Sequence, residues 1–397
     1  MLSWIRQTAA VLTLNVKTIP ARLGSSGVAI VGIAGVVVVF VSVLSIAAGF
    51  SSAMQGSGSP TRALVMRSGA DSEMTSGISG PHAEIVKQAP GTRRQGQTAL
   101  ASSELYVVID LPRKSSPDAG SNVPVRGIEP NGMTLRPEVS IVEGRMFQFG
   151  TDEVIVGQGA HRQFVNLNVG DTIISGQNRW NVVGVFEADG GVAESEVWTD
   201  ARTLQGAYRR GNTYQSVLVQ LESPNSFDSF RDWLLNNPQL NVSVRRENEY
   251  YAGQSKQLTT LIETIGYGIA VLMGVGAIFG AILTMYTSVA TRSREIATLR
   301  ALGFDTSSVL VSVLAESMVL GAIGGIIGGT AAYLAFNGYQ TSTMNFQTFS
   351  QVAFAFRVTP RLLGTGLAYA LIMGLVGGLF PAVRAARLPI PVALREL

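Results

Sequence analysis

One short charged segment separates two strongly apolar runs of this chain: Thr291-Arg292-Ser293-Arg294-Glu295-Ile296-Ala297-Thr298-Leu299-Arg300-Ala301-Leu302-Gly303-Phe304. Ile296 and Leu299 lie three residues apart, and Leu302 and Gly303 follow one turn further on, so a helix would place them on one apolar face. Charged side chains fall on the other faces: Arg292, Arg294, Glu295 and Arg300. Gly303 follows as a typical helix stop signal. The segment is therefore predicted to be a short amphipathic helix.

The chain as a whole is strongly apolar. Its 397 residues are 46% hydrophobic and 14% charged, with a mean hydropathy of +0.27, which is too apolar for an ordinary soluble domain. Four runs are long enough to cross a hydrocarbon core of about 30 Å: Gly27–Phe50, Ile265–Thr287, Val309–Phe336 and Leu362–Phe380. The sequence therefore predicts an α-helical membrane protein with four transmembrane helices, one before and three after a large insert.

Basic residues indicate which ends of these spans face the cytoplasm. They precede the first span and follow the second and fourth: Arg6, Lys17 and Arg22; Arg292, Arg294 and Arg300; Arg384, Arg387 and Arg395. Both termini are predicted to be cytoplasmic, with the insert on the outer side of the membrane. A signal peptide cleaved near Ser45-Ile46-Ala47 is the competing interpretation. The first apolar run is longer than the core of about 7–15 residues in a signal peptide, which favours an uncleaved anchor.

This layout predicts nine segments. They are an interfacial helix at 1–26, spans at 27–50, 261–289, 309–336 and 362–383, an outer domain at 51–260, a cytoplasmic coupling loop at 290–308, a short outer loop at 337–361 and a cytoplasmic tail at 384–397. The polar stretch Arg246–Thr260 is compatible with a helix that continues into the second span. The insert is long enough to bury its own core, or to split into two lobes.

The insert is predicted to be mixed α/β. Short segments rich in β-branched and aromatic residues, punctuated by Gly, Pro and Asn, read as strands: Leu105–Leu111, Val123–Ile128, Glu153–Gly157, Asp171–Ile174, Trp180–Phe186 and Ser216–Leu221. Ser226–Asn236 is predicted to be a helix, with Phe227, Phe230 and Leu234 on one face.

Motifs for catalysis are missing from this sequence. None of its four lysines follows a glycine, so there is no Walker A phosphate-binding loop. Gly157-Gln158-Gly159 follows a predicted strand, but Arg162 stands where a dinucleotide-binding loop needs glycine, so we interpret it as a strand-to-helix turn. The two histidines, His82 and His161, lack metal-binding spacing, and there is no cysteine. We therefore expect no cofactor, no metal, no catalysis within the chain and no nucleic-acid binding.

One acidic residue and several glycines stand out within the spans. Glu316 is interpreted either as a polar hinge or coupling contact, or as a side chain that snorkels or bonds to a neighbouring helix. Glycines at small-xxx-small spacing predict close helix packing, within the chain or across a dimer: Gly276 and Gly280; Gly321, Gly325 and Gly329; Gly374 and Gly378.

Three features resemble the permeases of the MacB, LolC/LolE and FtsX superfamily, the type VII ABC systems. Arg294-Glu295-Ile296-Ala297-Thr298-Leu299-Arg300-Ala301-Leu302-Gly303 is similar to the family's loop between its second and third spans. The tail, with Phe380-Pro381-Ala382 and Pro391-Val392-Ala393-Leu394-Arg395, resembles the family's C-terminal ending. The third feature is the one-plus-three order with a large outer domain, in which Val169-Gly170-Asp171 and Val182-Val183-Gly184-Val185-Phe186 resemble a MacB-type periplasmic domain.

The resemblance implies a permease subunit of a bacterial inner membrane, with its large domain in the periplasm. It would work by mechanotransmission to export or extract a substrate. Two permease chains, identical or related, would each present the coupling loop to a cytoplasmic ATPase dimer that binds ATP and Mg. MacB chains carry their ATPase ahead of the first span and this sequence starts almost at that span, so a separate ATPase polypeptide is expected. A periplasmic membrane-fusion adaptor is a further expected partner. The implied coupling residues are Arg292, Arg294, Glu295, Ile296, Leu299, Arg300 and Gly303.

Alternative functions stay open at this point. The coupling loop could be a membrane-surface helix held by anionic lipid. The chain could be an FtsX-like signal transducer that controls a periplasmic enzyme without transporting cargo. A secondary carrier is a third class, and it would require an activity that survives loss of every cytoplasmic ATPase. The sequence does not distinguish lipid, lipoprotein, peptide or small toxic molecule as a substrate.

Overall fold

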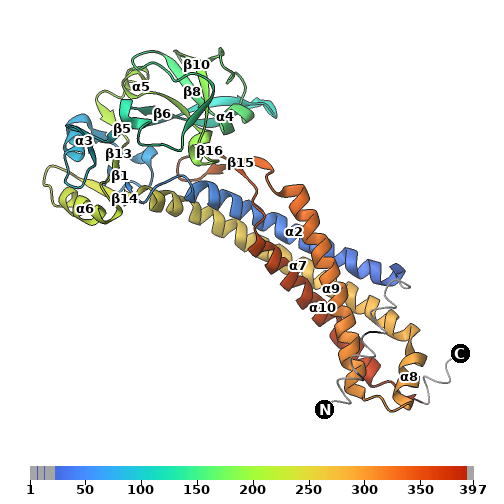
Figure 1. The fold of residues 1–397 in the computed structure, drawn as a ribbon. Coiled ribbons are helices and arrows are strands. Elements are labelled where there is room, and N and C mark those ends of the chain that lie inside the picture. The colour runs from blue at the N-terminus through green and yellow to red at the C-terminus, as the bar shows by residue number, and fades with distance from the viewer. Residues whose placement is uncertain (1–6, 8–12, 14–22, 391–397) are drawn as a thin grey trace. The chain divides into compact units, whose positions relative to one another are not determined.

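The computed structural model describes residues 7, 13 and 23–390, so the predicted interfacial helix at 1–26 and the end of the tail lie largely outside the described residues. The chain divides into two compact units (Figure 1). Among the continuously described residues, the helical unit contains 23–48, Leu261–Tyr339 and 356–390. The α/β unit contains Gly49–Thr260 and Gln340–Ala355.

Long apolar helices run through the helical unit. Among the described residues, four helices are long and apolar enough to cross a membrane: α2 (Leu23–Gln55), α7 (Glu247–Thr291), α9 (Thr306–Phe336) and α10 (Pro360–Ala386). Each contains one of the four predicted apolar runs. The polar residues before the second run continue into it without a break, as predicted, because α7 is one helix of 45 residues. At about 1.5 Å per residue its length is about 68 Å.

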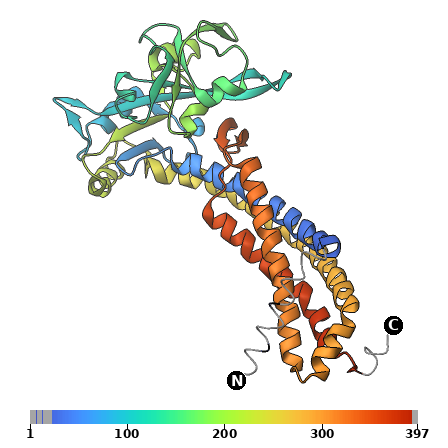
Figure 2. The same cartoon turned by 45° about the vertical axis from the view of Figure 1, so that its right-hand side comes forward.

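α9 packs against two other helices through glycines on two of its faces. Gly324 and Gly328 lie against α2, where a Cβ at Gly328 would stand 2.5 Å from the carbonyl oxygen of Ala34. Gly321 and Gly325 lie against α10, which runs beside α9 in Figure 2. A Cβ at Gly321 would stand 2.7 Å from the carbonyl oxygen of Ala370. The missing side chains therefore let the helix backbones touch.

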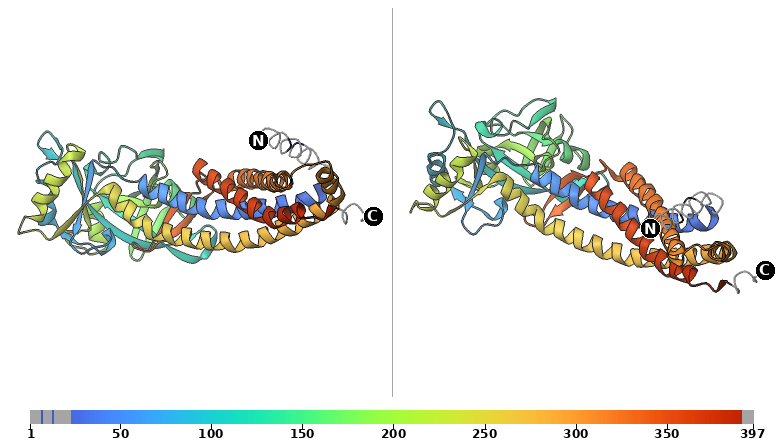
Figure 3. Two further views of the ribbon diagram at one scale, coloured as in Figure 1. Left: turned by 90° about the horizontal axis from the view of Figure 1, so that it is seen from below. Right: turned by 60° about the horizontal axis from the view of Figure 1, so that its bottom comes forward.

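The remaining predicted glycines differ in their surroundings. Gly329 faces Leu363, whose Cδ2 is 3.3 Å from an added Cβ. α7 runs alongside α2, as Figure 3 shows, and a Cβ at Gly266 would lie 2.9 Å from Val43. At Gly276 and Gly280 of α7, by contrast, an added Cβ has no neighbour within 4 Å among the described residues. These two glycines do not support packing within the chain, and packing across a dimer stays a prediction.

The α/β unit is built on a sheet of ten strands in its described residues. The order is β14-β1-β13-β5-β6-β11-β8-β10-β7, with β9 paired to β10. The strands are β1 (Arg62–Arg67), β5 (Ala101–Arg113), β6 (Ser116–Ile128), β7 (Ser140–Gly144), β8 (Glu153–Gly157), β9 (Thr172–Ser175), β10 (Asn178–Glu187), β11 (Val197–Asp200), β13 (Ser216–Gln220) and β14 (Val242–Arg246). The β6–β11 and β8–β10 pairs are parallel. All six predicted strands are present. Five have ends shifted by at most four residues, and β6 begins seven residues before the predicted start at Val123.

Separate hydrophobic cores lie along the two halves of this sheet. One core joins α3 (Gly80–Lys87) and α6 (Phe227–Leu235) to β1 and β13. Another joins α4 (Gln158–Gln163) and α5 (Ala201–Ala207) to β5, β6 and β8. α6 matches the predicted helix, and Phe227, Phe230 and Leu234 are buried. Because the sheet is continuous, the insert has separate cores without splitting into separate lobes.

A buried network of charged side chains joins strands of the sheet. The Arg126 guanidinium donates hydrogen bonds to Glu73, Glu104 and Glu196 at 2.7–3.0 Å. Arg136 donates two more to Glu104, at 2.7 and 2.8 Å. Each of these side chains is at most 6% exposed. Burial favours a high pKa for Glu104, but the charges of Arg136 and Arg126 outweigh it and hold that pKa below its usual range.

The loop between α9 and α10 forms a hairpin that belongs to the α/β unit. The sequence predicted only a short periplasmic loop at 337–361. The structure contains β15 (Gln340–Asn345) and β16 (Ser350–Ala355), which pair antiparallel. The predicted limits of the domain, 51–260, therefore omit one piece of it. That piece is separated from the rest by two long helices, and its polar sequence carries little strand signal.

Contacts with β5, α4 and the short turn before β11 hold this hairpin in place. The backbone N–H of Ala353 donates to Ser195 Oγ at 2.7 Å, and the hydroxyls of Ser350 and Tyr106 are 3.2 Å apart. Gly159 permits the close approach, since a Cβ there would lie 2.7 Å from the Cβ of Ala353. β8 ends at Gly157 and α4 begins at the next residue, which confirms the predicted strand-to-helix turn.

Candidate coupling site

The charged segment between α7 and α9 forms a helix, α8 (Ser293–Ala301). Arg292 interrupts the helical conformation between α7 and α8, with φ −113° and ψ 10°. At the other end Gly303 adopts φ +92°. Its N–H donates to the carbonyl of Arg300 at 3.1 Å, and the N–H of Phe304 donates to that of Leu299 at 3.2 Å. These bonds make a Schellman motif, so the predicted helix stop is confirmed.

One face of α8 packs onto the helical bundle. Ile296 and Ala297 are 7% and 1% exposed. Ile296 joins a cluster contributed by α7, α9 and α10: Met285, Val289, Val309, Val313, Ala382 and Ala385. Ile296 was among the implied coupling residues, but its side chain packs inside this chain. Spacing alone defines an apolar face and does not tell which surface that face meets.

The other face of α8 is exposed. It presents Arg294, Glu295, Thr298 and Leu302. Leu302 is 73% exposed, whereas Leu299 and Arg300 are half-buried. The sequence placed Leu302 on the apolar face with Ile296 and Leu299, which is wrong, because its side chain is exposed beside Arg294 and Glu295. Leu302 was also absent from the predicted coupling residues. Its position one turn beyond Thr298 was the signal that could have placed it on this face.

Polar bonds tie both ends of α8 to neighbouring helices. At the N-terminal end, Arg292 Nη1 donates to Glu316 Oε2 in α9 at 3.0 Å, and Nε donates to Glu295 Oε2 at 3.2 Å. At the C-terminal end, Arg300 Nη1 donates to the carbonyl oxygen of Leu388, just after α10. Glu316 is only 4% exposed in its side chain, so it bonds to its neighbour rather than snorkelling to solvent. Arg292 and Arg300 therefore hold α8, while Arg294 and Glu295 face outward.

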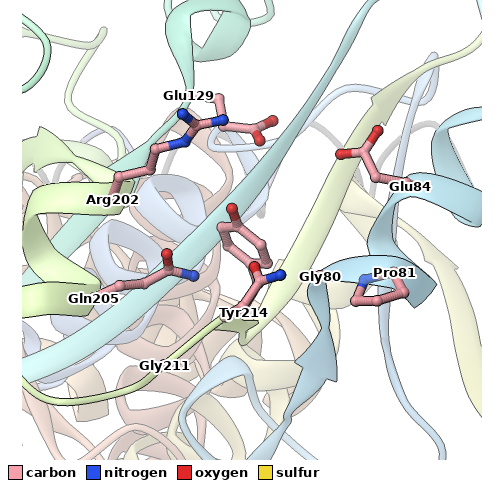
Figure 4. Close-up of a pocket in the computed structure, with 9 residues that line it drawn as sticks. Gly80, Pro81, Glu84, Glu129, Arg202, Gln205, Gly211 and Tyr214 are labelled. Atoms are coloured by element: carbon pink, nitrogen blue, oxygen red, sulfur yellow. The ribbon is translucent and has the colours of Figure 1, made fainter.

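The α/β unit also contains a groove of about 690 Å³ between α3 and α5 (Figure 4). Its lining includes Glu84 and Glu129, on which Lys87 Nζ forms ion pairs at 2.7 and 2.9 Å. Polar and apolar atoms line the groove about equally, unlike the mostly apolar walls of typical small-molecule sites. Among the described residues, no group of three or more His, Cys, Asp or Glu side chains is arranged to hold a metal. The exposed face of α8 is therefore the stronger candidate site.

Comparison with known families agrees with this division of the chain. Residues 26–236 match the profile described as the MacB-like periplasmic core domain. Residues 267–390 match the profile described as the FtsX-like permease C-terminal. The chain belongs to the MacB/FtsX family of ABC transporter permeases. The second match includes α8, so the candidate site lies in the permease part of the family.

Individual members of the MacB/FtsX family are similar over much of the chain. The macrolide export ATP-binding/permease protein MacB of Azoarcus sp. (strain BH72) is 24% identical over 369 residues, which cover 83% of this chain and 54% of that protein. The uncharacterized ABC transporter permease YknZ of Bacillus subtilis (strain 168) is 27% identical over 232 residues, 54% of this chain and 53% of that protein. The chain thus spans about half the length of these curated relatives. The solved extracellular domain of YknZ from Gram-positive bacteria is 17% identical, with a TM-score of 0.35 over 47% of this chain and 100% of that one.

Proposed function

We propose that this MacB/FtsX-family permease is the membrane subunit of an ATP-driven complex. In this proposal a separate cytoplasmic ATPase dimer binds ATP and Mg and pushes on α8, and the long helices transmit the motion to the α/β unit. That unit lies on the periplasmic side of a bacterial inner membrane, where the motion exports or extracts a substrate. Two copies of the permease form the membrane part, and a membrane-fusion adaptor is the expected outer partner.

The exposed face of α8 is the observation that carries this proposal. A leucine that is 73% exposed, with Arg294 and Glu295 on the same face, suits a protein contact with an apolar centre and a charged rim. Burial of one leucine side chain contributes about 1.5–3 kcal/mol. The anchored inner face supports the same function, because a helix that packs onto the bundle can pass force into it. The basic residues near α8 favour the cytoplasmic side.

Substitution of Leu302 tests the contact. The tagged chain is purified from its own membranes, and the co-purifying ATP-binding subunit is quantified by mass spectrometry and by its rate of ATP hydrolysis. Leu302→Asp is expected to lower recovery of that subunit about tenfold or more, since about 1.4 kcal/mol corresponds to a factor of ten. The matched control is Leu235→Asp, because Leu235 is 53% exposed in the α/β unit.

The outcomes separate the competing functions. Equal recovery with Leu302→Asp and Leu235→Asp contradicts α8 as the ATPase contact and favours a lipid-bound surface helix. Loss with Leu302→Asp alone supports the ATPase-driven permease. Transport and signalling are then distinguished by the protein that crosslinks to the α/β unit. An adaptor supports export, whereas a periplasmic hydrolase supports an FtsX-like transducer.

A further inference from the structure

Arg292 bridges two carboxylates from two different helices. Its guanidinium contacts the buried Glu316 of α9 at 3.0 Å and the exposed Glu295 in the first turn of α8 at 3.2 Å. The side chains of Arg292 and Glu316 are 10% and 4% exposed, while that of Glu295 is 63% exposed. The bridge therefore extends from the outward face of α8 to the inside of the bundle.

The position of this bridge gives it mechanical importance. The helical geometry breaks at Arg292, so α7 and α8 are separate helices and α8 can tilt about that break. A side-chain bond at the same point limits the tilt. An ion pair in a low-dielectric environment is strong, and removal of either partner takes away part of the compensation of the other buried charge. The Arg292–Glu316 pair therefore resists separation of α8 from α9.

Glu316 lies where α9 and α10 are in direct backbone contact. The next residue, Ser317, donates its hydroxyl proton to the carbonyl oxygen of Gly374 in α10. A Cβ at Gly374 would stand 2.7 Å from the carbonyl oxygen of Ser317, and one at Gly378 would stand 2.5 Å from the Cβ of Ser317. A displacement of α9 at this level must therefore move α10 as well.

We infer that Glu316 is a positioning residue that clamps α8, through Arg292, to the contact between α9 and α10. Force on the exposed face of α8 then reaches both helices together. The bond from Arg300 to the carbonyl oxygen of Leu388 complements the clamp at the other end of α8. The clamp consists only of residues of this chain and needs no partner protein. Its use in coupling rests on the proposed function.

Cysteine accessibility tests the clamp without the ATPase. The chain contains no cysteine, so Ala297→Cys, at a site that is 1% exposed on the inner face of α8, is a unique thiol. Its rate of maleimide labelling is expected to rise about tenfold or more in both Glu316→Gln and Arg292→Met backgrounds. The control thiol, Ala332→Cys in α9 at a site that is 0% exposed, is expected to stay protected. Unchanged labelling of Ala297→Cys in both backgrounds overturns the clamp.

A second experiment tests the role in coupling with the ATP-binding subunit present. Tyr339→Cys, at an exposed site just beyond α9, carries a fluorescent label, and its emission is compared with ATP and with ADP. In an otherwise unaltered chain the signal is expected to depend on the nucleotide. Glu316→Gln is expected to keep the ATP-binding subunit bound but to lose the dependence of the signal on the nucleotide. A general structural defect would instead reduce both the binding and the signal.

The two experiments assign a failure to its source. A nucleotide-dependent signal that persists in Glu316→Gln overturns the positioning role. No nucleotide-dependent signal in the otherwise unaltered chain overturns the proposed function and the coupling role with it, while labelling of Ala297→Cys still decides the clamp.

Discussion

At the scale of single residues, the stability of the α/β unit depends on Arg126, which forms ion pairs with three buried carboxylates. Arg126→Ala removes the guanidinium and leaves Glu73, Glu104 and Glu196 buried with reduced compensation. Removing one partner of a buried ion pair costs about 3–5 kcal/mol. We therefore expect the free energy of unfolding of this unit to fall by about that amount, measured by denaturant unfolding of the full chain in detergent.

Arg145 provides the matched control for this prediction. It also binds a glutamate through two nitrogens, Glu153 at 2.5 and 2.7 Å, but its side chain is 53% exposed. Exposed ion pairs contribute about 0–1 kcal/mol, so Arg145→Ala is expected to change the stability little. Equal losses for Arg126→Ala and Arg145→Ala would show that burial of the network adds nothing.

At the scale of elements, docking of the β15–β16 hairpin onto the rest of the α/β unit depends on one glycine in α4. Gly159→Ala places a Cβ 2.7 Å from the Cβ of Ala353 and 3.0 Å from the carbonyl oxygen of Glu194. Overpacking of this kind costs about 1–3 kcal/mol, so backbone amides of β16 are expected to exchange hydrogen faster. The control is Gly206→Ala in α5, where an added Cβ has no described neighbour within 4 Å. That change is expected to stabilise α5 by about 0.5–1 kcal/mol. Unaltered exchange in Gly159→Ala contradicts this account of the docking.

Elements with strong local patterns were predictable from the sequence, and elements that depend on distant partners were not. The apolar runs predicted the four long helices, and Gly303 predicted the end of α8. β15 escaped prediction because Gln340–Asn345 is polar and is a strand only when it pairs with β16. At the candidate site the helix and its charges were predicted. Burial of Ile296 and pairing of Arg292 with Glu316 depend on α9. The spacing of residues within α8 does not specify where α9 lies.

At the scale of the whole molecule, the chain forms two units. The polar part of α7 belongs to the α/β unit and its longer apolar part, which is called here the apolar half, belongs to the helical unit. Much of the apolar half is exposed: Leu272, Phe279 and Leu283 are 76%, 63% and 68% exposed. In a membrane these side chains meet lipid or a second copy of the chain. Small residues at a helix surface favour helix association in lipid, which makes the face around Gly276 the expected contact of the proposed homodimer.

Gly276→Ile is expected to weaken that dimer without unfolding the chain. An added side chain at Gly276 meets no described residue of its own chain within 4 Å, so the melting temperature of the monomer should change little. Between two copies the same side chain would separate closely packed backbones, and the dimer fraction, measured by crosslinking in native membranes, should fall. Gly364→Ile is the control, since Gly364 of α10 also has open space around an added Cβ. An unchanged dimer fraction with Gly276→Ile would assign this face of α7 to lipid, and the second copy would then have to pack elsewhere on the helical unit.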